Sequence, residues 1–410
     1  MNHKFAKYSA NPNHPNWEAL TARADSLYHK DGDIRSPFAR DYTRILHSMA
    51  YRRLKHKTQV FFNIDNDHIC TRMEHVSHVA SVSGTIAKEL GLNEELTRAI
   101  SIGHDLGHAP FGHQGEQVLN KLAQKYLGKP FWHERNGLHF VDNVELLEDP
   151  RRIRRNLDLT YAVRDGILSH CGEVDQNGLF PRDISIPLED FDTAGKYEAA
   201  TWEGCVVKLA DKISYLGRDI EDALSLGFLS EADQRQLQDM ARKSAQDALS
   251  TTVIIHNLII DVCRHSSPEV GITLSPEAFN SMTELKEFNT QKIYHHPRLE
   301  PYRCYSELII NRIFDTLLKC CDGENTWSIL KKKGKYMPQL CGTFGCWLCC
   351  FCTSDILPEG EWKEEAARCK NRKIYGNLDS MQIRAQAVID FISGMTDRFA
   401  VSMFQEMLSY

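Results

Sequence analysis

Apolar residues along most of this chain are spaced three and four positions apart, which places them on one face of an α-helix. In the segment 40–56, this spacing predicts a single helix whose other side carries arginine and lysine. Segments 73–92 and 93–108 repeat the pattern. The first ends near Gly91 and the second begins at Asn93, residue types that favour helix C-termini and N-termini, respectively. Because no run of strand or hairpin signals interrupts this pattern, we predict an all-α fold.

The rest of the chain continues with helical spacing, interrupted by one long polar segment. We expect further helices at about 131–149, 158–173, 198–226, 230–263, 275–292, 300–322 and 378–408. Segment 173–197 is rich in Gly, Pro and Asp, which predicts a long loop. The 410 residues are enough for one large domain or two intimately packed domains.

The composition is that of a water-soluble globular protein, with 42% hydrophobic and 25% charged residues. The formal net charge of −6 gives no bulk attraction to nucleic acids or membranes, so local cations have to hold any anionic substrate. The first residues lack the apolar region of a signal peptide, and no stretch approaches the roughly 20 apolar residues that span a bilayer. We therefore expect a cytoplasmic protein with no membrane partner.

The stretch SIGHDLGHAPFGHQGE, residues 101–116, has a composition that a packed apolar core does not require. His104 and Asp105 are adjacent, and His108 follows His104 by one helical turn, so polar side chains converge where the pattern stops at Pro110. Metal binding and acid–base catalysis both use these residue types. A chance cluster of structural histidines is the alternative interpretation.

A second polar cluster lies on the helix predicted at 198–226. At 100° per residue, several acidic, basic and phenolic side chains fall within an arc of about 120°. These side chains are Asp211, Lys212, Tyr215, Arg218 and Asp219. Because apolar residues flank the arc, we predict a partly buried helix whose polar face meets a cavity. A solvated charged stripe is the alternative.

Two imidazoles and two carboxylates from these segments form a mixed nitrogen and oxygen ligand set. The four ligands are His75, His104, Asp105 and Asp211. The set suits one divalent ion, with Mn or Mg as first choices and Fe, Co, Ni or Zn as alternatives. Without a thiolate, a closed structural zinc site is not expected, and positions stay open for water and substrate. A polyphosphate needs further cations, which Arg72 and Lys212 supply.

These residues, in this order, resemble the H…HD…D signature of the HD-domain metal-dependent phosphohydrolases, which are all-helical. The longer motifs RMEHVSHV, GHDLGHAPFGHQGE and ADKISYLGRDIEDAL look specifically like the dGTPase-like branch, the deoxynucleoside triphosphate triphosphohydrolases. The stretches 36–61 and 388–400 are similar to the same branch. We therefore expect an N-terminal extension at 1–34, an HD-domain catalytic core at 35–226, and additional C-terminal helices at 227–410 packed on that core.

The resemblance implies a catalytic set among the remaining histidines and one acid. His113 and Glu116 match residues of the catalytic machinery, and His108 and His133 match groups that approach the phosphates. We expect His113, oriented by Glu116, to carry the proton transfer, because imidazole titrates near neutral pH and a carboxylate fixes its tautomer.

The resemblance also implies substrate contacts. Arg72 and Lys212 match phosphate-binding cations. Asp219 matches a group that bonds the 3′-hydroxyl of the deoxyribose, and Tyr215 matches one that packs where a 2′-hydroxyl would lie. Relatives commonly carry a sugar-recognising Gln where this chain has Lys55, whose amine can donate to a sugar hydroxyl or bind a phosphate instead.

The function expected from these features is metal-dependent hydrolysis of dGTP or of deoxynucleoside triphosphates (dNTPs) in general, by attack at the α-phosphorus, to deoxynucleoside and inorganic triphosphate. The alternatives are an HD-domain nucleotidase or phosphodiesterase acting on mono- or cyclic nucleotides, and a catalytically silent nucleotide sensor. Relatives assemble as tetramers or hexamers, so we expect a homo-oligomer. An allosteric nucleotide and a nucleic-acid contact stay open as further partners.

Two weaker features lie elsewhere in the chain. Nine of the thirteen cysteines follow residue 300, and CGTFGCWLCCFC at Cys341–Cys352 contains overlapping C-x-x-C spacings. Buried, reduced cysteines on an apolar helix explain this cluster better than a zinc site, which favours separated pairs. The basic run 150–157 is interpreted as a solvated loop, with an allosteric nucleotide or nucleic-acid contact as the alternative.

Overall fold

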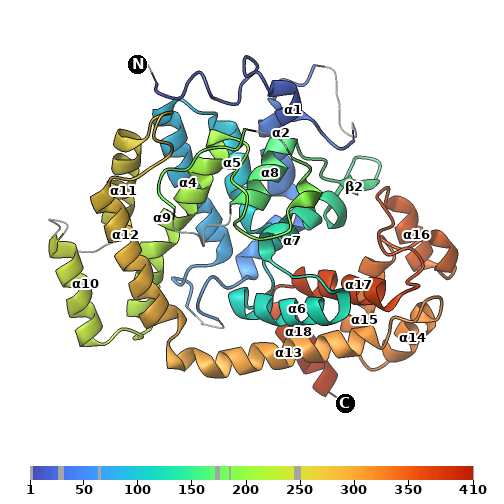
Figure 1. The fold of residues 1–410 in the computed structure, drawn as a ribbon. Helices are drawn as coiled ribbons and strands as arrows, with labels where there is room; N and C mark the ends of the chain where they lie inside the picture. The colour runs from blue at the N-terminus through green and yellow to red at the C-terminus, as the bar shows by residue number, and fades with distance from the viewer. Residues whose placement is uncertain are drawn as a thin grey trace. The chain divides into compact units, whose positions relative to one another are not determined.

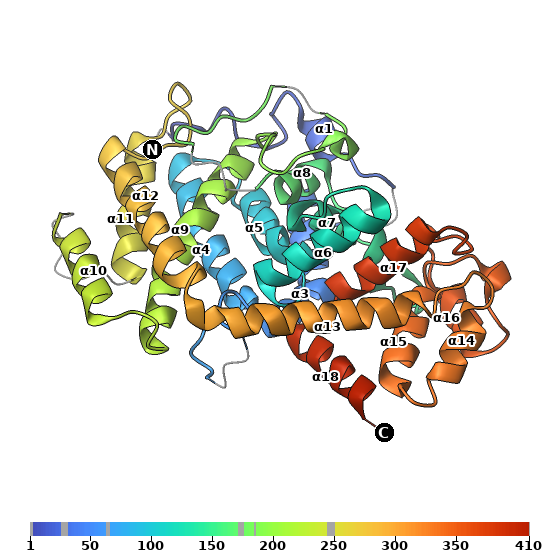
Figure 2. The ribbon, with the colours of Figure 1, turned by 60° about the horizontal axis from the view of Figure 1, so that its bottom comes forward.

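A computed structural model describes residues 3–25, 32–62, 66–170, 176–183, 186–243 and 251–409, without the side chains of 241–243. The described residues are mostly helical and contain a single two-stranded sheet (Figures 1 and 2). The predicted all-α fold is therefore confirmed. No helix in this part of the chain combines the length and the apolar character needed to cross a bilayer.

The chain divides into two compact units, each built from three separated stretches. The first unit consists of Met1–Leu46, Gln59–Asp105 and Leu159–Glu300, and the second of His47–Thr58, Leu106–Asp158 and Pro301–Tyr410. The short 3-10 helix η2 (His104–Gly107) carries the chain from the first unit into the second. The boundaries expected at residues 34 and 226 stay a prediction.

The first unit is an assembly of helices around α9. Its helical elements are α1 (Trp17–Thr21), α2 (Pro37–His47), α4 (Arg72–Leu90), α5 (Glu94–Gly103), α8 (Tyr161–Ser169), η4 (Leu188–Asp190), α9 (Trp202–Ser225), α10 (Glu231–Lys243), α11 (Thr251–His265), α12 (Pro276–Asn289), η5 (Thr290–Tyr294) and η6 (Pro297–Leu299). Helix α9 packs against α4, α5, α8, α11 and α12, so most of its side chains are buried (Figure 1). This central position explains why its apolar residues surround the polar face.

Side-chain caps fix the ends of the two helices that pack on α9. Helix α4 begins with a capping box, in which Thr71 and Glu74 each accept a hydrogen bond from the backbone of the other, and it ends at Gly91 with a left-handed φ of 82°. Helix α5 begins at Asn93, whose side chain accepts from the backbone of Glu95 and Leu96. Both ends expected from Gly91 and Asn93 are confirmed.

The second unit combines helices with one short hairpin. Its elements are α3 (Met49–Arg53), η1 (Leu54–His56), α6 (Gly112–Leu127), α7 (His133–His139), the π-helical turn η3 (Phe140–Val144), β1 (Leu146–Glu148), β2 (Arg154–Asn156), α13 (Glu300–Leu318), α14 (Thr326–Lys333), α15 (Pro338–Leu348), η7 (Ser354–Ile356), α16 (Glu361–Arg368), α17 (Met381–Ser393) and α18 (Asp397–Leu408). Helix α17 packs against α6 and α15, while α15 also contacts α14, α16 and α18.

Four local predictions were wrong. The helix expected at 131–149 ends with the π-helical turn η3, and Leu146–Glu148 form strand β1 instead. The single helix expected at 40–56 breaks at Ser48, whose extended backbone and side chain cap α3 instead of continuing α2. The helix expected at 378–408 is two helices, because Thr396 caps the start of α18. The interpretation of 150–157 as a loop missed the antiparallel pairing of β1 with β2, in which Leu146 lies opposite Asn156.

The cysteine cluster is part of the core of the second unit. Cys341, Cys349, Cys350 and Cys352 are buried, and the rings of Trp347 and its aromatic neighbours pack beside them. Among the described residues, every group of three or more side chains close enough to share a metal ion consists of His, Asp and Glu. These thiols therefore act as apolar core residues, as expected for buried cysteines.

One glycine in η2 is required by close backbone packing. A Cβ atom added to Gly107 would lie 2.0 Å from the carbonyl oxygen of His133 and 2.1 Å from the backbone nitrogen of Gly137. Asn136 also donates from Nδ2 to the Gly107 carbonyl at 2.7 Å. The start of α7 is thus packed directly on the Gly107 backbone.

We predict that Gly107→Ala lowers the free energy of unfolding by at least about 3 kcal/mol, because backbone atoms cannot move aside for the methyl group. Thermal and urea denaturation measure the change. The matched control is Gly342→Ala in α15, where an added Cβ meets nothing within 4 Å and helix propensity favours alanine. Equal stability of the two variants would contradict the close packing.

Candidate active site

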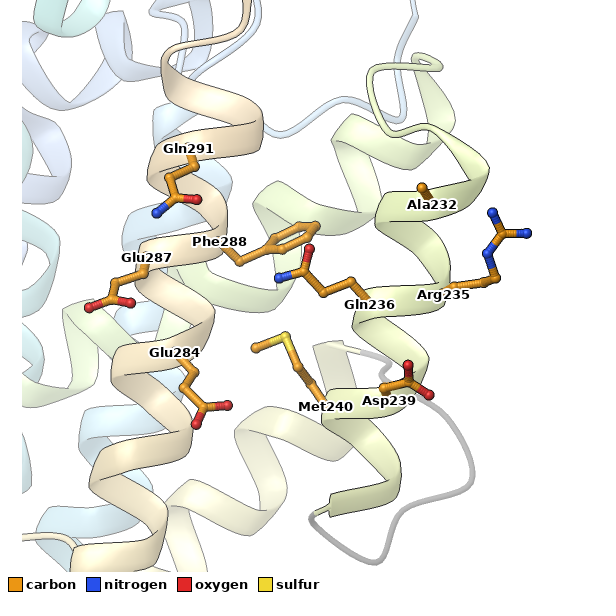
Figure 3. A pocket seen from close by; sticks show the side chains of 9 residues that line it. All are labelled: Ala232, Arg235, Gln236, Asp239, Met240, Glu284, Glu287, Phe288 and Gln291. Atoms are coloured by element: carbon orange, nitrogen blue, oxygen red, sulfur yellow. The ribbon is translucent and has the colours of Figure 1, made fainter.

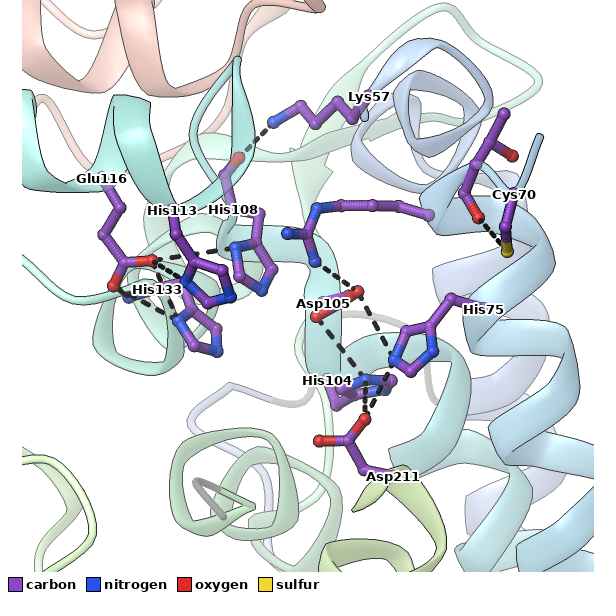
Figure 4. Close-up of polar contacts among 12 residues, drawn as sticks. Lys57, Cys70, His75, His104, Asp105, His108, His113, Glu116, His133 and Asp211 are labelled. Atoms are coloured by element: carbon purple, nitrogen blue, oxygen red, sulfur yellow. Dashed lines mark hydrogen bonds and ion pairs between the residues drawn. The ribbon is translucent and has the colours of Figure 1, made fainter. Parts of the chain in front are cut away.

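Three helical segments of the first unit bring the four predicted metal ligands together. His75 lies in the first turn of α4, His104 and Asp105 follow the end of α5, and Asp211 lies on α9 (Figure 4). His75 Nε2 lies 2.9 Å from Asp211 Oδ1, and His104 Nε2 lies 3.8 Å from the same oxygen. Asp105 lies 3.5 Å from His104 Nε2 and 4.0 Å from His75 Nε2 through its two carboxylate oxygens. The packing of α4 on α5 and α9 creates this cluster.

His104 gives a structural test of whether these residues fit a metal ion. Its ring is buried, and its Nδ1 lies 2.6 Å from the carbonyl oxygen of Ser101. A carbonyl only accepts, so Nδ1 carries the proton and Nε2 keeps its lone pair. This buried Nε2 has no hydrogen-bond partner among the described residues. Because donor atoms of His75, His104 and Asp211 all lie within 4.8 Å of one another, the set fits one ion.

His170 joins this cluster, although the sequence patterns did not single it out. It follows the last residue of α8, is buried, and its ring lies 4.9 Å from that of His104. With His104 and Asp105 it forms a second group of candidate ligands within 4.8 Å. The sequence predicted a helix at 158–173. No local spacing pattern connected His170, near the end of this segment, with His104 and Asp105, which lie more than sixty positions earlier.

Arg72 is a buried cation beside the metal ligands. Its exposed fraction is 2%, and its Nη1 donates to Asp105 Oδ2 at 2.9 Å. The remaining nitrogens, Nε and Nη2, are buried and have no hydrogen-bond partner within the described chain. A buried guanidinium with open N–H groups is unfavourable unless an anion satisfies them. Lys212, the other predicted phosphate-binding cation, is buried on α9.

Asp219 and Tyr294 form a short hydrogen bond at the other end of the polar face of α9. The hydroxyl of Tyr294 donates to Asp219 Oδ2 at 2.6 Å. Burial raises the pKa of Asp219 to about 7, although this hydrogen bond acts in the opposite direction. Tyr215 lies half-buried one turn earlier on the same helix. Tyr294 was not predicted from the sequence, because it lies in η5, 75 residues after Asp219 and outside the motifs that resemble the family.

The four predicted catalytic residues form a cluster within the second unit. Glu116 accepts hydrogen bonds from the backbone nitrogen of His133 at 2.9 Å and from its Nδ1 at 3.2 Å (Figure 4). The rings of His108 and His133 stack with centroids 3.8 Å apart. His113 Nδ1 lies 3.9 Å from Glu116, and the His113 side chain is 66% exposed. Glu116 therefore contacts His133 more closely than His113.

The electrostatics of this cluster keep Glu116 ionised. Burial raises the pKa of Glu116, but the charge and hydrogen bonds of His133, together with the charge of His113, outweigh burial and hold the pKa at about 2. A carboxylate that stays charged at neutral pH fixes the Nδ1–H tautomer of His133, so that the lone pair of the ring lies on Nε2.

The lysine at position 55 is exposed on η1, and no described contact connects it with the other predicted site residues. Its neighbour Lys57 is buried instead, and it donates to the backbone carbonyls of His108 and, at 2.9 Å, Ser393. The motif KHKTQVF thus contributes a structural lysine that the sequence analysis did not identify.

A groove between α10 and α12 is a concave feature of the first unit. It has a volume of about 560 Å³, and Gln236, Met240 and Phe288 point into it (Figure 3). None of its lining residues belongs to the predicted site, and its lining is mostly polar or acidic. The histidine and aspartate cluster is therefore the better candidate for an active site.

We predict that Asp219 makes the stability of the protein fall as pH rises from about 4 to about 7. The pKa of Asp219 is about 7 in the folded protein, whereas the ordinary value is 3.8. Between these two values the folded state binds more protons than the unfolded state, so a rise in pH lowers the free energy of unfolding. Asp219→Asn should flatten this slope in denaturation curves measured against pH. Asp379→Asn, at an exposed position, is the control and should leave the slope unchanged. Parallel curves for wild type and Asp219→Asn would contradict the raised pKa.

Comparisons with known protein families agree with this geometry. The HD domain family matches residues 72–216, a range that contains all four candidate metal ligands. A phosphohydrolase-associated domain matches residues 370–406, which include α17 and most of α18.

Curated relatives cover nearly the whole chain. Three examples each carry the name deoxyguanosinetriphosphate triphosphohydrolase-like protein. The relative from Clostridium tetani is 31% identical over 92% of this chain and 86% of its own length. The relative from Caldanaerobacter subterraneus is 32% identical over the same shares, and that from Desulfatibacillum aliphaticivorans is 32% identical over 91% of this chain and 88% of its own length. This chain therefore belongs to the HD-domain family of deoxyguanosinetriphosphate triphosphohydrolase-like proteins.

Proposed function

We propose that this protein is a metal-dependent phosphohydrolase that converts dNTPs, dGTP among them, to deoxynucleoside and inorganic triphosphate. The observation that carries the proposal is Arg72, whose buried guanidinium has open N–H groups beside the metal-ligand cluster. A site for an anion therefore adjoins a site for a cation, which is the combination that phosphate chemistry uses. The names of the relatives, which refer to dGTP, support the choice of nucleotide.

The ligands that would hold one divalent ion are His75, His104, Asp105 and Asp211. The ion, with Mn or Mg as first choices, would supply positive charge that stabilises phosphate oxygens during hydrolysis. In the structure, His75 Nε2 lies at hydrogen-bonding distance from Asp211 Oδ1, so loading the site releases a proton from this pair.

The residues of α9 set which end of the nucleotide lies near the ligands. Tyr215 and Asp219 follow Asp211 by one and two helical turns, about 6 and 12 Å along the axis. If these residues hold the deoxyribose, the α-phosphate is the phosphate nearest to Asp211. Arg72 and Lys212 then bind the phosphates, and Tyr215 leaves no room for a 2′-hydroxyl.

We assign proton transfer to the histidine cluster of the second unit. Only Leu106 and Gly107 separate Asp105 from His108 along the chain, so the cluster directly follows two of the metal ligands in sequence. The ionised Glu116 orients His133 through its Nδ1, and His113 is accessible to solvent for proton exchange. The imidazole groups therefore have both the tautomer control and the access that acid–base catalysis requires.

Three points of the expected function stay predictions. They are the role of Lys55, assembly into a tetramer or hexamer, and activation by a second nucleotide. Hydrolysis of mono- or cyclic nucleotides is less well supported, because such substrates do not need two buried cations together with a sugar-binding aspartate.

We predict that His104→Ala combined with Asp105→Ala lowers both metal content and turnover, the latter by more than about 100-fold, while helicity is retained. Elemental analysis after gel filtration, circular dichroism and a dNTP hydrolysis assay measure the three quantities. His256→Ala removes an exposed imidazole on α11 and should change none of them. Wild-type metal content in the double variant would show that these residues are not ligands.

The bond that breaks separates this function from its alternatives. We expect hydrolysis in ¹⁸O-water to place the label in inorganic triphosphate and none in the deoxynucleoside, because water attacks the α-phosphorus. Mass spectrometry of both products makes the measurement, with each dNTP tested alone and in pairs. Label in the 5′-hydroxyl, or accumulation of dNMP with pyrophosphate, would exclude the proposed reaction. Absence of hydrolysis with every metal and nucleotide pair would favour a nucleotide sensor.

A further inference from the structure

The turn between His108 and His113 contains an unusual backbone conformation. Phe111 has a φ of 67°, and the next residue, Gly112, has a φ of 58°. Glycine adopts this left-handed region without strain, but the side chain of phenylalanine disfavours it. Such a conformation persists only where the surrounding structure fixes it. The contacts of Phe111 therefore determine the course of the chain between the two histidines.

Hydrogen bonds hold the backbone of Phe111 at both its N–H and its carbonyl group. Its N–H donates to Asp397 Oδ1 at 2.8 Å, and its carbonyl accepts from the hydroxyl of Tyr302 at 2.8 Å. Its ring is only 1% exposed. Asp397 is the first residue of α18, and its second oxygen, Oδ2, accepts from the backbone N–H of Thr58 at 2.9 Å.

The same turn is fixed at its other end by Lys57. The Lys57 ammonium donates to the carbonyl of His108 (Figure 4) and to the carbonyl of Ser393 at 2.9 Å. Residues 57–58 and 393–397 thus hold 108–111 through two charged groups, Lys57 and Asp397, which are both buried. We call Lys57, Tyr302 and Asp397 the turn clamp.

We infer that Asp397 is a positioning residue for the proposed reaction, because it fixes the strained turn that sets the relative placement of His108 and His113. The inference rests on the proposed function, in which these histidines take part in catalysis. Residues 370–406 match a domain described only as phosphohydrolase-associated, and the contacts of Asp397 give that segment a specific role. Asp397 acts through the backbone and does not contact substrate.

The chemistry of the contact makes Asp397→Asn the most direct test. Asp397 accepts from two backbone N–H groups with two different oxygens. The asparagine amide has one acceptor oxygen, so its NH₂ group must face one of the two donors. The substitution therefore removes one hydrogen bond and introduces a donor–donor contact, with almost no change in side-chain volume.

The experiment compares full-length, metal-loaded Asp397→Asn with Thr396→Ala. Thr396 caps α18 by accepting from the backbone of Phe399, but it makes no described contact with 108–113, so its loss weakens the same helix only. We expect Asp397→Asn to lower kcat for dNTP hydrolysis by about 100-fold, as a displaced catalytic group does, with KM changed less than about threefold. Thr396→Ala should keep kcat within about twofold.

A second readout does not depend on activity. Diethyl pyrocarbonate modifies accessible imidazoles, and peptide mass spectrometry locates the modified residues. His108 is buried and should be protected in wild type and in Thr396→Ala, whereas Asp397→Asn should expose it. His113, which is 66% exposed, should react in all three proteins and serves as the internal control.

Tyr302→Phe provides the test if Asp397→Asn does not fold, because it removes only the hydroxyl that bonds Phe111. We expect it to lower kcat and to increase modification of His108 in the same direction. Wild-type kcat and full protection of His108 in either folded clamp variant would overturn the inference. Equal losses of kcat in Asp397→Asn and Thr396→Ala, with His108 protected, would also overturn it. If the wild-type protein hydrolyses no dNTP but modification of His108 differs among the variants as expected, the proposed function is contradicted. The role of Asp397 in holding the turn is then still supported.

Discussion

The candidate site depends on one electrostatic constraint, the placement of a buried and a partly buried carboxylate, Asp105 and Asp211, where α4, the end of α5 and α9 meet. An unpaired buried ion costs several kcal/mol, so Asp105 and Asp211 persist only beside positive charge. Arg72 donates to Asp105, and His75 lies against Asp211. His104 adds a lone pair that no described donor satisfies and that a divalent ion can use. The helices that pack around α9 therefore also carry the charged residues of the site. The packing of these helices and the pairing of these charges depend on each other.

Close backbone packing and buried hydrogen bonds hold the segment that follows. Gly107 lies against the backbone of His133 and Gly137, and Phe111 is held in a left-handed conformation by hydrogen bonds from distant parts of the second unit. Close contacts of this kind cannot relax without moving whole helices. Asp397 shows how a C-terminal segment without candidate chemistry can still control the geometry of a site.

The sequence predicted the features that depend on local patterns. Helical periodicity gave the all-α fold, and residue types at helix ends gave the limits of α4 and α5. The sequence did not predict the break at Ser48, because the apolar helical spacing continues from α2 into α3. The side chain of Ser48 nevertheless caps α3 and ends the first helix. Partners such as His170, Tyr294 and Asp397 were missed for a different reason. Their roles come from contacts across 66 to 286 residues, which no local spacing encodes.

Helix α9 shows how burial can give two carboxylates of one face different protonation states. Asp211 is partly buried, and desolvation raises its pKa, but the hydrogen bond from His75 and the charges of the nearby histidines outweigh this effect and lower the pKa to about 2. Asp219, about two turns later, has a neutral phenol as its one hydrogen-bond partner among the described residues, and burial raises its pKa to about 7. One carboxylate therefore stays an anion suited to a metal ion, while the other carries a proton for part of the time near neutral pH and can then donate it to a sugar oxygen. The same helix can thus bind a cation at one end and a neutral hydroxyl at the other, which is the division that a nucleotide bound along α9 would require.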